Sequence, residues 1–217
     1  CQHAEHTFAG VPCGIMDQLA VIHSPLHGAV MIDCRSLVLR NVKLDPSLAV
    51  IVTDSGVRHD LAEGEYGMRR EQCAVAVAAL KERYPHGTAL RDAMRNELID
   101  VRDSIDPIAV RRARHVILEN QRVRMVADAL DSGYFETAGF LMYESHRSLR
   151  DDDEVSCAEL DMLVRLTRTM RDVYGSRMTG GGFGGSTVTL CRAEAADAVI
   201  DELVAGYRQH TGREARS

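Results

Sequence analysis

A carboxylate stands in an apolar setting near the start of the chain. The stretch "GVPCGIMDQ" (10–18) surrounds Asp17 with small and apolar residues. Apolar surroundings disfavour an unpartnered carboxylate, which either takes up a proton or destabilises the fold. Asp17 therefore either caps a helix or does chemistry that needs a shielded, ionised carboxylate, such as general base catalysis.

A second candidate is the glycine-rich stretch "TGGGFGG" (179–185). Consecutive glycines weaken a helix or strand because each loses much backbone freedom on folding. In a loop they let the backbone approach a ligand and aim several N–H groups at one point, most often at a phosphate. The alternative is a tight loop needed only for packing. The stretch matches neither the Walker A motif nor the Rossmann fingerprint, since a strand is expected after it.

Three further polar stretches contain candidate site residues, each with a simpler alternative. "TDSGVRH" (53–59) follows an apolar run, so it is either a site at a strand end or a solvated turn. "EYGMRREQC" (65–73) contains two arginines that are ligands or surface charges, and "ESHRSLRDDDE" (144–154) ends in acids that suit a solvated helix end or N-cap carboxylates. The candidates in these stretches are Asp54, Ser55, Arg58, His59, Tyr66, Arg69, Arg70 and His146.

Composition indicates a globular protein with a substantial core. Hydrophobic residues make up 45% of the 217 residues, and the formal net charge of −6 argues against a nucleic-acid-binding protein. The six cysteines form no C-x-x-C pair, which disfavours a zinc site and favours a reduced, cytosolic protein. No run of about 20 apolar residues is present, so the sequence predicts no membrane span.

Hydrophobic periodicity predicts strands and helices in an α+β arrangement. Asp106 and Pro107 mark a helix start, Ser156 and Glu159 form a capping box for a helix that Gly175 ends, and Asp45-Pro46 breaks the pattern near a domain boundary. The expected strands are 28–34, 37–44, 48–54 and 186–191, and the expected helices are 65–84, 106–132, 135–149, 156–174 and 193–207.

Seven segments, taken in order, resemble the galactokinases, which belong to the GHMP small-molecule kinases. The resemblance covers essentially the whole chain; the glycine loop alone points to the superfamily, and the segments at 13–18 and 65–73 narrow it to galactokinases. The segments are "CGIMDQ" (13–18), "IDCRSL" (32–37), "TDSGVRH" (53–59), "EYGMRREQC" (65–73), "RARHVILEN" (112–120), "ESHRSLRDD" (144–152) and "MTGGGFGG" (178–185).

The resemblance implies an activity and roles for particular residues. Galactokinases transfer the γ-phosphate of ATP to the 1-hydroxyl of galactose, giving galactose 1-phosphate. Asp17 matches the catalytic base, Gly14 a glycine against the sugar, and Tyr66 a tyrosine whose hydroxyl contacts the sugar. The residues that match the phosphate-side glycine loop are Thr179, Gly180, Gly181, Gly182 and Gly184.

The resemblance also implies a domain division. Residues 1–46 are expected to end a ribosomal S5-like N-terminal domain, and 47–217 to form a ferredoxin-like C-terminal domain. The family's "GRVNLIGEHTDY"-like and "GLSSSA"-like motifs do not occur in the sequence. We therefore expect the ATP and Mg²⁺ ligands to lie outside this chain, no metal ligand within it, and no activity from the chain alone. The complete protein is expected to be a cytoplasmic monomer that binds a sugar and ATP, with neither nucleic acid nor membrane as partner.

Two alternatives to a galactokinase remain open at this point. One is a kinase for a related sugar, such as an N-acetylgalactosamine kinase. The other is a non-catalytic, galactokinase-like regulator that binds sugar and ATP, since retention of Asp17 alone does not separate the two. Segments outside this chain would discriminate among these readings.

Overall fold

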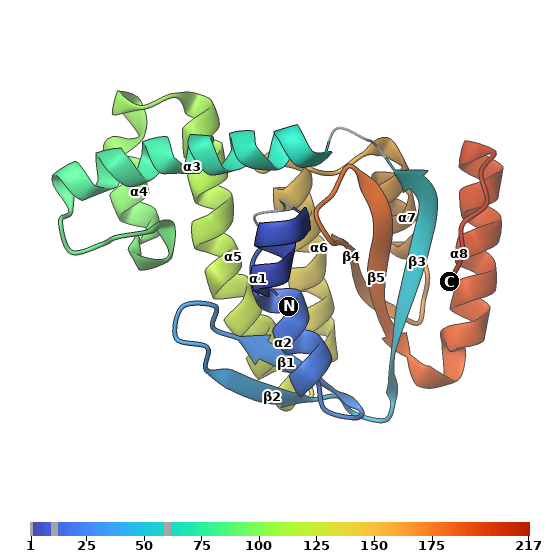
Figure 1. Cartoon of the computed structure of the whole chain (residues 1–217). Helices are drawn as coiled ribbons and strands as arrows, with labels where there is room; N and C mark the ends of the chain where they lie inside the picture. Colours follow the sequence, from blue (N-terminus) through green and yellow to red (C-terminus); the bar gives the residue numbers. More distant parts are fainter. Residues whose placement is uncertain (1, 10–12, 59–61) are drawn as a thin grey trace.

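The computed structural model describes residues 2–9, 13–58 and 62–217 of the chain (Figure 1). Its helices are α1 (Gln2–Ala4), α2 (Met16–His23), α3 (Ala62–Arg83), α4 (Arg95–Val101), α5 (Pro107–Asp131), α6 (Phe135–Asp151), α7 (Ala158–Thr167) and α8 (Ala196–Thr211). Its strands are β1 (Gly28–Ile32), β2 (Leu39–Lys43), β3 (Leu48–Arg58), β4 (Val173–Thr179) and β5 (Gly184–Arg192). Short 3₁₀ or π turns occupy Glu5–Ala9, Leu90–Asp92, Arg102–Ser104 and Ala193–Ala195.

An antiparallel sheet with strand order β3-β5-β4 forms the centre of the C-terminal part. Helices α7 and α8 cover one face, and α6 packs against the other (Figure 1). Near the C-terminus, Arg216 pairs with Asp54 at the free edge of β3 through backbone bonds of 2.7 and 3.0 Å. Layers of helix on an antiparallel sheet are the expected α+β arrangement.

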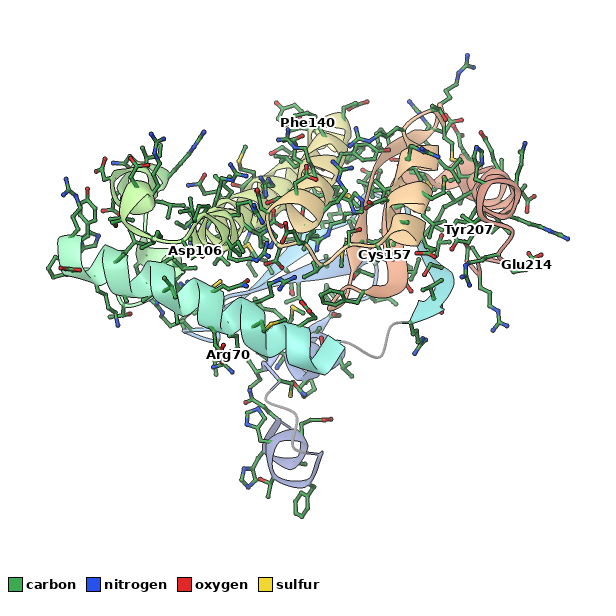
Figure 2. All side chains as sticks on the ribbon, turned by 90° about the horizontal axis from the view of Figure 1, so that it is seen from above. Arg70, Asp106, Phe140, Cys157, Tyr207 and Glu214 are labelled. Atoms are coloured by element: carbon green, nitrogen blue, oxygen red, sulfur yellow. The ribbon has the colours of Figure 1, made fainter. Side chains whose placement is uncertain are left out.

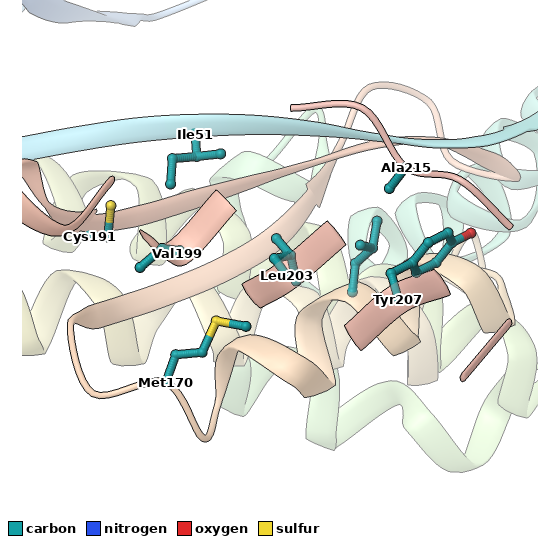
Figure 3. Close-up of a cluster of buried hydrophobic side chains, with 8 residues drawn as sticks. Ile51, Met170, Cys191, Val199, Leu203, Tyr207 and Ala215 are labelled. Atoms are coloured by element: carbon teal, nitrogen blue, oxygen red, sulfur yellow. The ribbon is translucent and has the colours of Figure 1, made fainter. Parts of the chain in front are cut away.

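The main core cluster lies between this sheet and helices α7 and α8 (Figure 3). Ile51 and Cys191 come from the sheet, while Leu163 and Leu203 come from the two helices, and all four are buried. Tyr207 closes one end of the cluster, and its buried hydroxyl donates to the Ser55 carbonyl at 2.9 Å. Burial of this apolar face fixes the helices on the sheet and therefore fixes the strand ends.

A second cluster joins α3, α4 and α5 beside the sheet. Ala76 and Leu80 of α3 pack against Ala113 and Ile117 of α5, and each is buried. The predicted start of α5 is confirmed, because the Asp106 carboxylate accepts from the Ile108 N–H at 2.6 Å and caps the helix. In this helical layer α3 packs across α5 (Figures 1 and 2).

The β1–β2 hairpin forms a separate two-stranded sheet. Reciprocal ion pairs link its turn to the segment before α4: Arg91 donates to Asp33 at 2.7 and 2.8 Å, and Arg35 donates to Asp92 at 2.7 and 3.1 Å. Arg40 adds contacts to two carboxylates near the end of α5 at 2.7 Å each. Exposed ion pairs thus join the hairpin to the helical layer, in addition to burial of Val42 on β2.

Several predicted boundaries were wrong, including those of the 193–207 helix, which is α8 (Ala196–Thr211). Strand β3 does not end at residue 54 but continues to Arg58, because a bulge after Asp54 lets the strand resume pairing with β5. The predicted 156–174 helix ends at Thr167, and Gly175 lies inside β4 instead of ending a helix. A β-carbon on Gly175 would lie 2.2 Å from the Gly139 carbonyl oxygen, so this glycine allows α6 to cross β4 closely.

The predicted capping box at the start of α7 was also wrong. Cys157 occupies the N-cap position, and the helix begins at Ala158. The Ser156 hydroxyl donates at 2.6 Å to the carboxylate of Asp161, which lies inside the helix. The sequence spacing matched a capping box, but the backbone enters the helix one residue later.

Candidate functional site

The glycine-rich stretch forms the turn between β4 and β5. Gly180 and Gly182 have left-handed φ angles of 82° and 91°, which strain any residue with a β-carbon. A β-carbon on Gly182 would also lie 2.3 Å from the Val155 carbonyl oxygen, which accepts the Phe183 N–H at 2.7 Å. Contacts within the chain therefore account for the glycine at 182.

Gly184 and Gly181 differ in the reason for having no side chain. A β-carbon on Gly184 would lie 2.3 Å from the Val57 carbonyl oxygen, and its φ is 117°. At exposed Gly181 a β-carbon would meet no atom within 4 Å, so no contact in the described part of the chain requires glycine there. Packing explains Gly184, whereas Gly181 leaves its backbone open to a ligand.

The exposed side of this turn borders an open groove of about 1030 Å³ between α3 and α5. Thr179, Gly180 and Gly181 are all exposed, and the two glycines line the groove. The glycine turn and α3, the helix that contains the 65–73 segment, thus border the same groove. The other lining residues include Arg69, Arg70, Cys73, Val77, Lys81, Arg91, His115, Asn120 and Asp153.

Asp17 lies in the first turn of α2, where its carboxylate is exposed. A carboxylate at this position interacts favourably with the positive end of the helix dipole. Gly14, just before the helix, is also exposed, and a β-carbon there would meet nothing within 4 Å. The Tyr66 side chain lies outside the described residues, so the sugar contact that the resemblance implies for Tyr66 stays a prediction.

Comparisons with known proteins agree on one family. The "GHMP kinases C terminal" family model matches residues 126–209. The chain is 52% identical over 208 residues to a galactokinase of Homo sapiens and 48% identical over 212 residues to one of Chloroflexus aggregans, covering 95% and 98% of this chain. A crystal structure of Lactococcus lactis galactokinase complexed with galactose matches 99% of this chain with a TM-score of 0.92 and 29% identity.

Over 95% or more of its length the chain is similar to galactokinases in sequence and fold, and residues 126–209 match the C-terminal domain of GHMP kinases. The predicted fold class is confirmed, since the mixed α and β arrangement matches the GHMP kinase fold and contains the GHMP C-terminal domain. The chain spans about half the length of the curated relatives it matches, 52% of the human galactokinase and 54% of the Chloroflexus one.

The sequence did not reveal a buried arginine that lies near the glycine turn. Arg112 of α5 is 2% exposed and reaches the loop that joins α6 to α7. Arg69, which the sequence left open as a surface charge, is mostly buried and bonds the same loop. The detectable signal was the run of acids at 151–154, which suited a solvated helix end equally well.

His146, another candidate site residue, makes contacts that stabilise the fold. It is 3% exposed, and its Nδ1 accepts the Met178 N–H at 3.2 Å while its Nε2 lies 3.1 Å from an Asp161 carboxylate oxygen. Burial raises the pKa of Asp161, but hydrogen bonds from His146 and Ser156 outweigh this and hold that pKa below its usual value. These contacts tie α6 to β4 and α7.

Of the candidates in the 53–59 segment, Ser55 and Asp54 also make contacts within the fold. The buried Ser55 hydroxyl donates to the Gly185 carbonyl at 2.7 Å, and Asp54 pairs through its backbone with Arg216. Exposed Arg58 lies 3.7 Å from the Asp54 carboxylate, and His59 lies outside the described residues. Ser55 and Asp54 therefore secure the edge of the sheet.

The described residues contain neither a candidate metal cluster nor a candidate membrane-spanning helix. Across 2–9, 13–58 and 62–217, no three or more His, Cys, Asp or Glu side chains gather in a way that could hold a metal ion. Within the same ranges, no helix combines the length and apolar character needed to cross a membrane. Cys73 faces the groove, and burial raises the pKa of its thiol, which keeps it protonated at neutral pH.

Proposed function

We propose that the protein containing this chain transfers the γ-phosphate of ATP to the 1-hydroxyl of galactose and releases galactose 1-phosphate. The observation that carries the proposal is 51% identity to a Bos taurus galactokinase across 95% of the chain. The fold agreement with a galactokinase that was solved with galactose supports the same substrate class.

Asp17 is proposed as the general base. Its carboxylate would accept the proton of the sugar 1-hydroxyl as that oxygen attacks the γ-phosphorus and the bond to the β-phosphate oxygen breaks. The small residue Gly14, with open space around it, leaves room for a sugar near the base. Tyr66 is proposed to donate a hydroxyl hydrogen bond to the sugar.

The glycine turn is proposed to line the phosphate side of the site. Open backbone at Gly180 and Gly181 supports this role, since N–H groups that no side chain shields can bond phosphate oxygens. Gly182 and Gly184 would keep the turn in shape by close packing, with Thr179 leading into it. Phosphoryl transfer depends mainly on such positioning and charge stabilisation.

ATP is proposed as the phosphoryl donor, and Mg²⁺ as the ion that neutralises charge on its phosphates when bound. The described residues offer no cluster suited to Mg²⁺, so its ligands and most ATP contacts are proposed to lie outside this chain. Residues 1–46 are proposed to complete an N-terminal domain and 47–217 to form the C-terminal domain, consistent with the separate β1–β2 sheet.

The complete protein is proposed to act as a monomer in the cytoplasm, with the sugar and ATP as its partners. The cysteines of the described residues are free, as expected in a reducing compartment. The net charge of −6 supports a function without nucleic acid.

The test is to purify the complete gene product and follow sugar phosphorylation by phosphorus NMR. With Mg-ATP and galactose, we expect a new resonance of a sugar 1-phosphate and stoichiometric ADP. N-acetylgalactosamine serves as the matched substrate and is expected to give much slower turnover. Preference for the N-acetylated sugar, or ATP binding without transfer to either sugar, would overturn the proposal.

A further inference from the structure

The segment 152–155, which we call the acidic loop, connects α6 to α7 and supports the glycine turn. The Val155 carbonyl accepts the Phe183 N–H at 2.7 Å and occupies the space that a side chain at Gly182 would need. Val155 is buried and packs in one cluster with Phe183. The conformation of the acidic loop therefore sets the position of the glycine turn.

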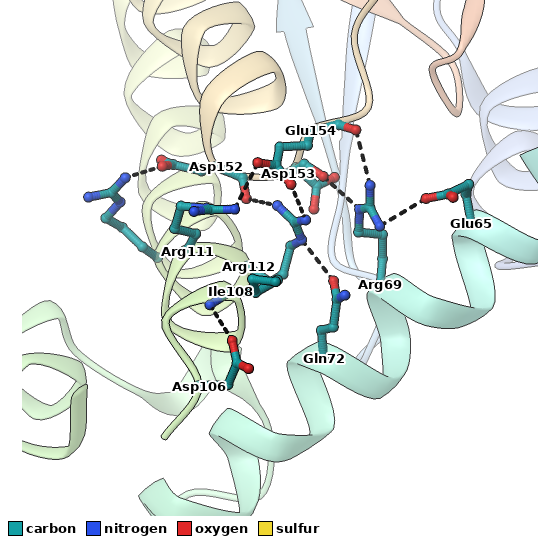
Figure 4. Close-up of polar contacts among 11 residues, drawn as sticks. Glu65, Arg69, Gln72, Asp106, Ile108, Arg111, Arg112, Asp152, Asp153 and Glu154 are labelled. Atoms are coloured by element: carbon teal, nitrogen blue, oxygen red, sulfur yellow. Dashed lines mark hydrogen bonds and ion pairs between the residues drawn. The ribbon is translucent and has the colours of Figure 1, made fainter. Parts of the chain in front are cut away.

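Arg112 holds the acidic loop from below (Figure 4). Its guanidinium donates to the Asp152 carbonyl, to the Glu154 carboxylate and, at 2.9 Å, to the Gln72 side-chain oxygen on α3. With 2% exposure, Arg112 has little contact with water, so these partners must satisfy its charge. The planar fork of arginine reaches all three partners, which a lysine ammonium does not reproduce.

Arg69 of α3 holds the next part of the acidic loop. Its Nε donates to the Asp153 carbonyl at 2.7 Å and its Nη2 to the Glu154 carbonyl at 3.1 Å, while Glu65 pairs with it at 3.0 Å. Carbonyls of three successive residues thus accept arginine N–H groups. The two arginines come from different helices and converge on one loop, as Figure 4 shows.

Two features destabilise the conformation of the acidic loop. Glu154 has a left-handed φ of 54°, a conformation that is strained for a residue with a β-carbon. Three successive acidic side chains also repel one another. Hydrogen bonding to Arg112 keeps the pKa of Glu154 below its usual value, which fits a carboxylate held ionised against the guanidinium. Arg112 and Arg69 offset these costs. Arg111 and Arg114 add ion pairs to the carboxylates of Glu154 and Asp152.

We infer that Arg112 and Arg69 are positioning residues, which hold the acidic loop so that the glycine turn keeps the shape it needs beside the phosphates. This inference rests on the proposed function. It also links α3, which carries Tyr66 three residues before Arg69, to the phosphate side of the site. Neither arginine needs to touch a substrate for this role.

The direct test is hydrogen exchange at the Phe183 amide, which donates to Val155. Arg112→Met is expected to raise its exchange rate about tenfold or more relative to amides of the β3–β5 ladder, the range expected from losing charge-assisted hydrogen bonds. Arg122→Met is the control, because Arg122 lies on the same helix, is mostly buried and pairs with Glu119 instead of the acidic loop. Equal relative rates in the two variants would overturn the inference.

Milder variants keep the test informative if Arg112→Met does not fold. Glu154→Gln removes one charged partner of Arg112 from a side chain that is 43% exposed, and a smaller increase at Phe183 is expected. Arg112→Lys is expected to keep only part of the protection that the Phe183 amide has in the unmodified protein. Unchanged exchange in Glu154→Gln together with full protection in Arg112→Lys would also overturn the inference.

Kinetics of the complete gene product separate this inference from the proposed function. Arg112→Lys is expected to lower kcat about tenfold while the Kd for galactose stays within about twofold. If Arg112→Lys speeds exchange at the Phe183 amide but leaves kcat unchanged, Arg112 only stabilises the fold, and its proposed role in positioning the site is overturned. If the unmodified protein phosphorylates no sugar, the proposed function is wrong. The exchange experiment still tests independently whether Arg112 holds the acidic loop and the glycine turn.

Discussion

Gly182 lies directly against the Val155 carbonyl, with no room for a β-carbon between the glycine turn and the acidic loop. Its neighbour Gly181 is exposed and meets nothing. Two adjacent glycines thus have different reasons to be glycine, and alanine substitution separates the reasons.

We expect Gly182→Ala to destabilise the fold by about 3 kcal/mol, because it combines a close contact with a left-handed φ. Gly181→Ala is expected to change stability by less than about 0.5 kcal/mol, as for other exposed sites. In the complete gene product, Gly181→Ala is nevertheless expected to lose most activity. Urea unfolding followed by circular dichroism, paired with the ADP-release assay, measures both effects. Full activity in Gly181→Ala would show that no ligand approaches that backbone.

Helical glycines give a second contrast. Alanine normally stabilises a helix relative to glycine, and Gly67→Ala in α3, with open space around it, is expected to add about 0.5 to 1 kcal/mol. Gly139→Ala in α6 is expected to do the opposite and cost about 2 kcal/mol or more, because its β-carbon would lie 2.0 Å from the Tyr174 carbonyl oxygen. Thermal unfolding of both variants checks the signs. Stabilisation by Gly139→Ala would mean that α6 does not cross β4 so closely.

The reciprocal ion pairs of the β1–β2 hairpin predict acid sensitivity. Hydrogen bonds from Arg91 and Arg35 hold the pKa values of Asp33 and Asp92 well below their usual range. The unfolded carboxyls have pKa values near about 3.9, so the pairs stabilise the attachment of the hairpin above that pH. This contribution is lost as the pH falls from about 4 towards the lower folded values.

Proteolysis of the hairpin between pH 6 and pH 3 measures this effect with an acid-stable protease. The pairs are exposed, so we expect a modest change that added salt reduces. Asp33→Asn is the matched variant and is expected to flatten the pH profile. Profiles that coincide for both proteins would show that the ion pairs do not hold the hairpin.

Much of the fold could be predicted from sequence because its signals were local. The Asp106-Pro107 start of α5 was confirmed, since the cap and the fixed proline φ act within one turn. The role of Gly175 was predicted incorrectly, because its reason lies in Gly139, far away in the sequence. The spacing of Ser156 and Glu159 also matched a capping box, but Cys157 is the N-cap residue of α7 in the structure.

The candidate site shows the same limit. The glycine turn could be found from composition, but the sequence could not separate packing glycines from Gly181. Arg112 could not be identified, because its partners on α3 and the acidic loop are about 40 residues away on either side. The burial of Arg112 and its hydrogen bonds depend on how α3, α5 and the acidic loop pack together, which local sequence patterns do not predict.

The most direct test of the central claim is the turnover of Asp17→Asn in the complete gene product. Asparagine keeps the shape of the side chain but does not accept the proton, so we expect kcat for galactose to fall about 10²–10⁴-fold. The fold and the Kd for galactose are expected to stay unchanged, and Asp172→Asn, which alters an exposed ion pair, is the control. Near-normal turnover of Asp17→Asn, measured by coupled ADP release, would contradict the account and reduce Asp17 to a favourable charge at a helix start.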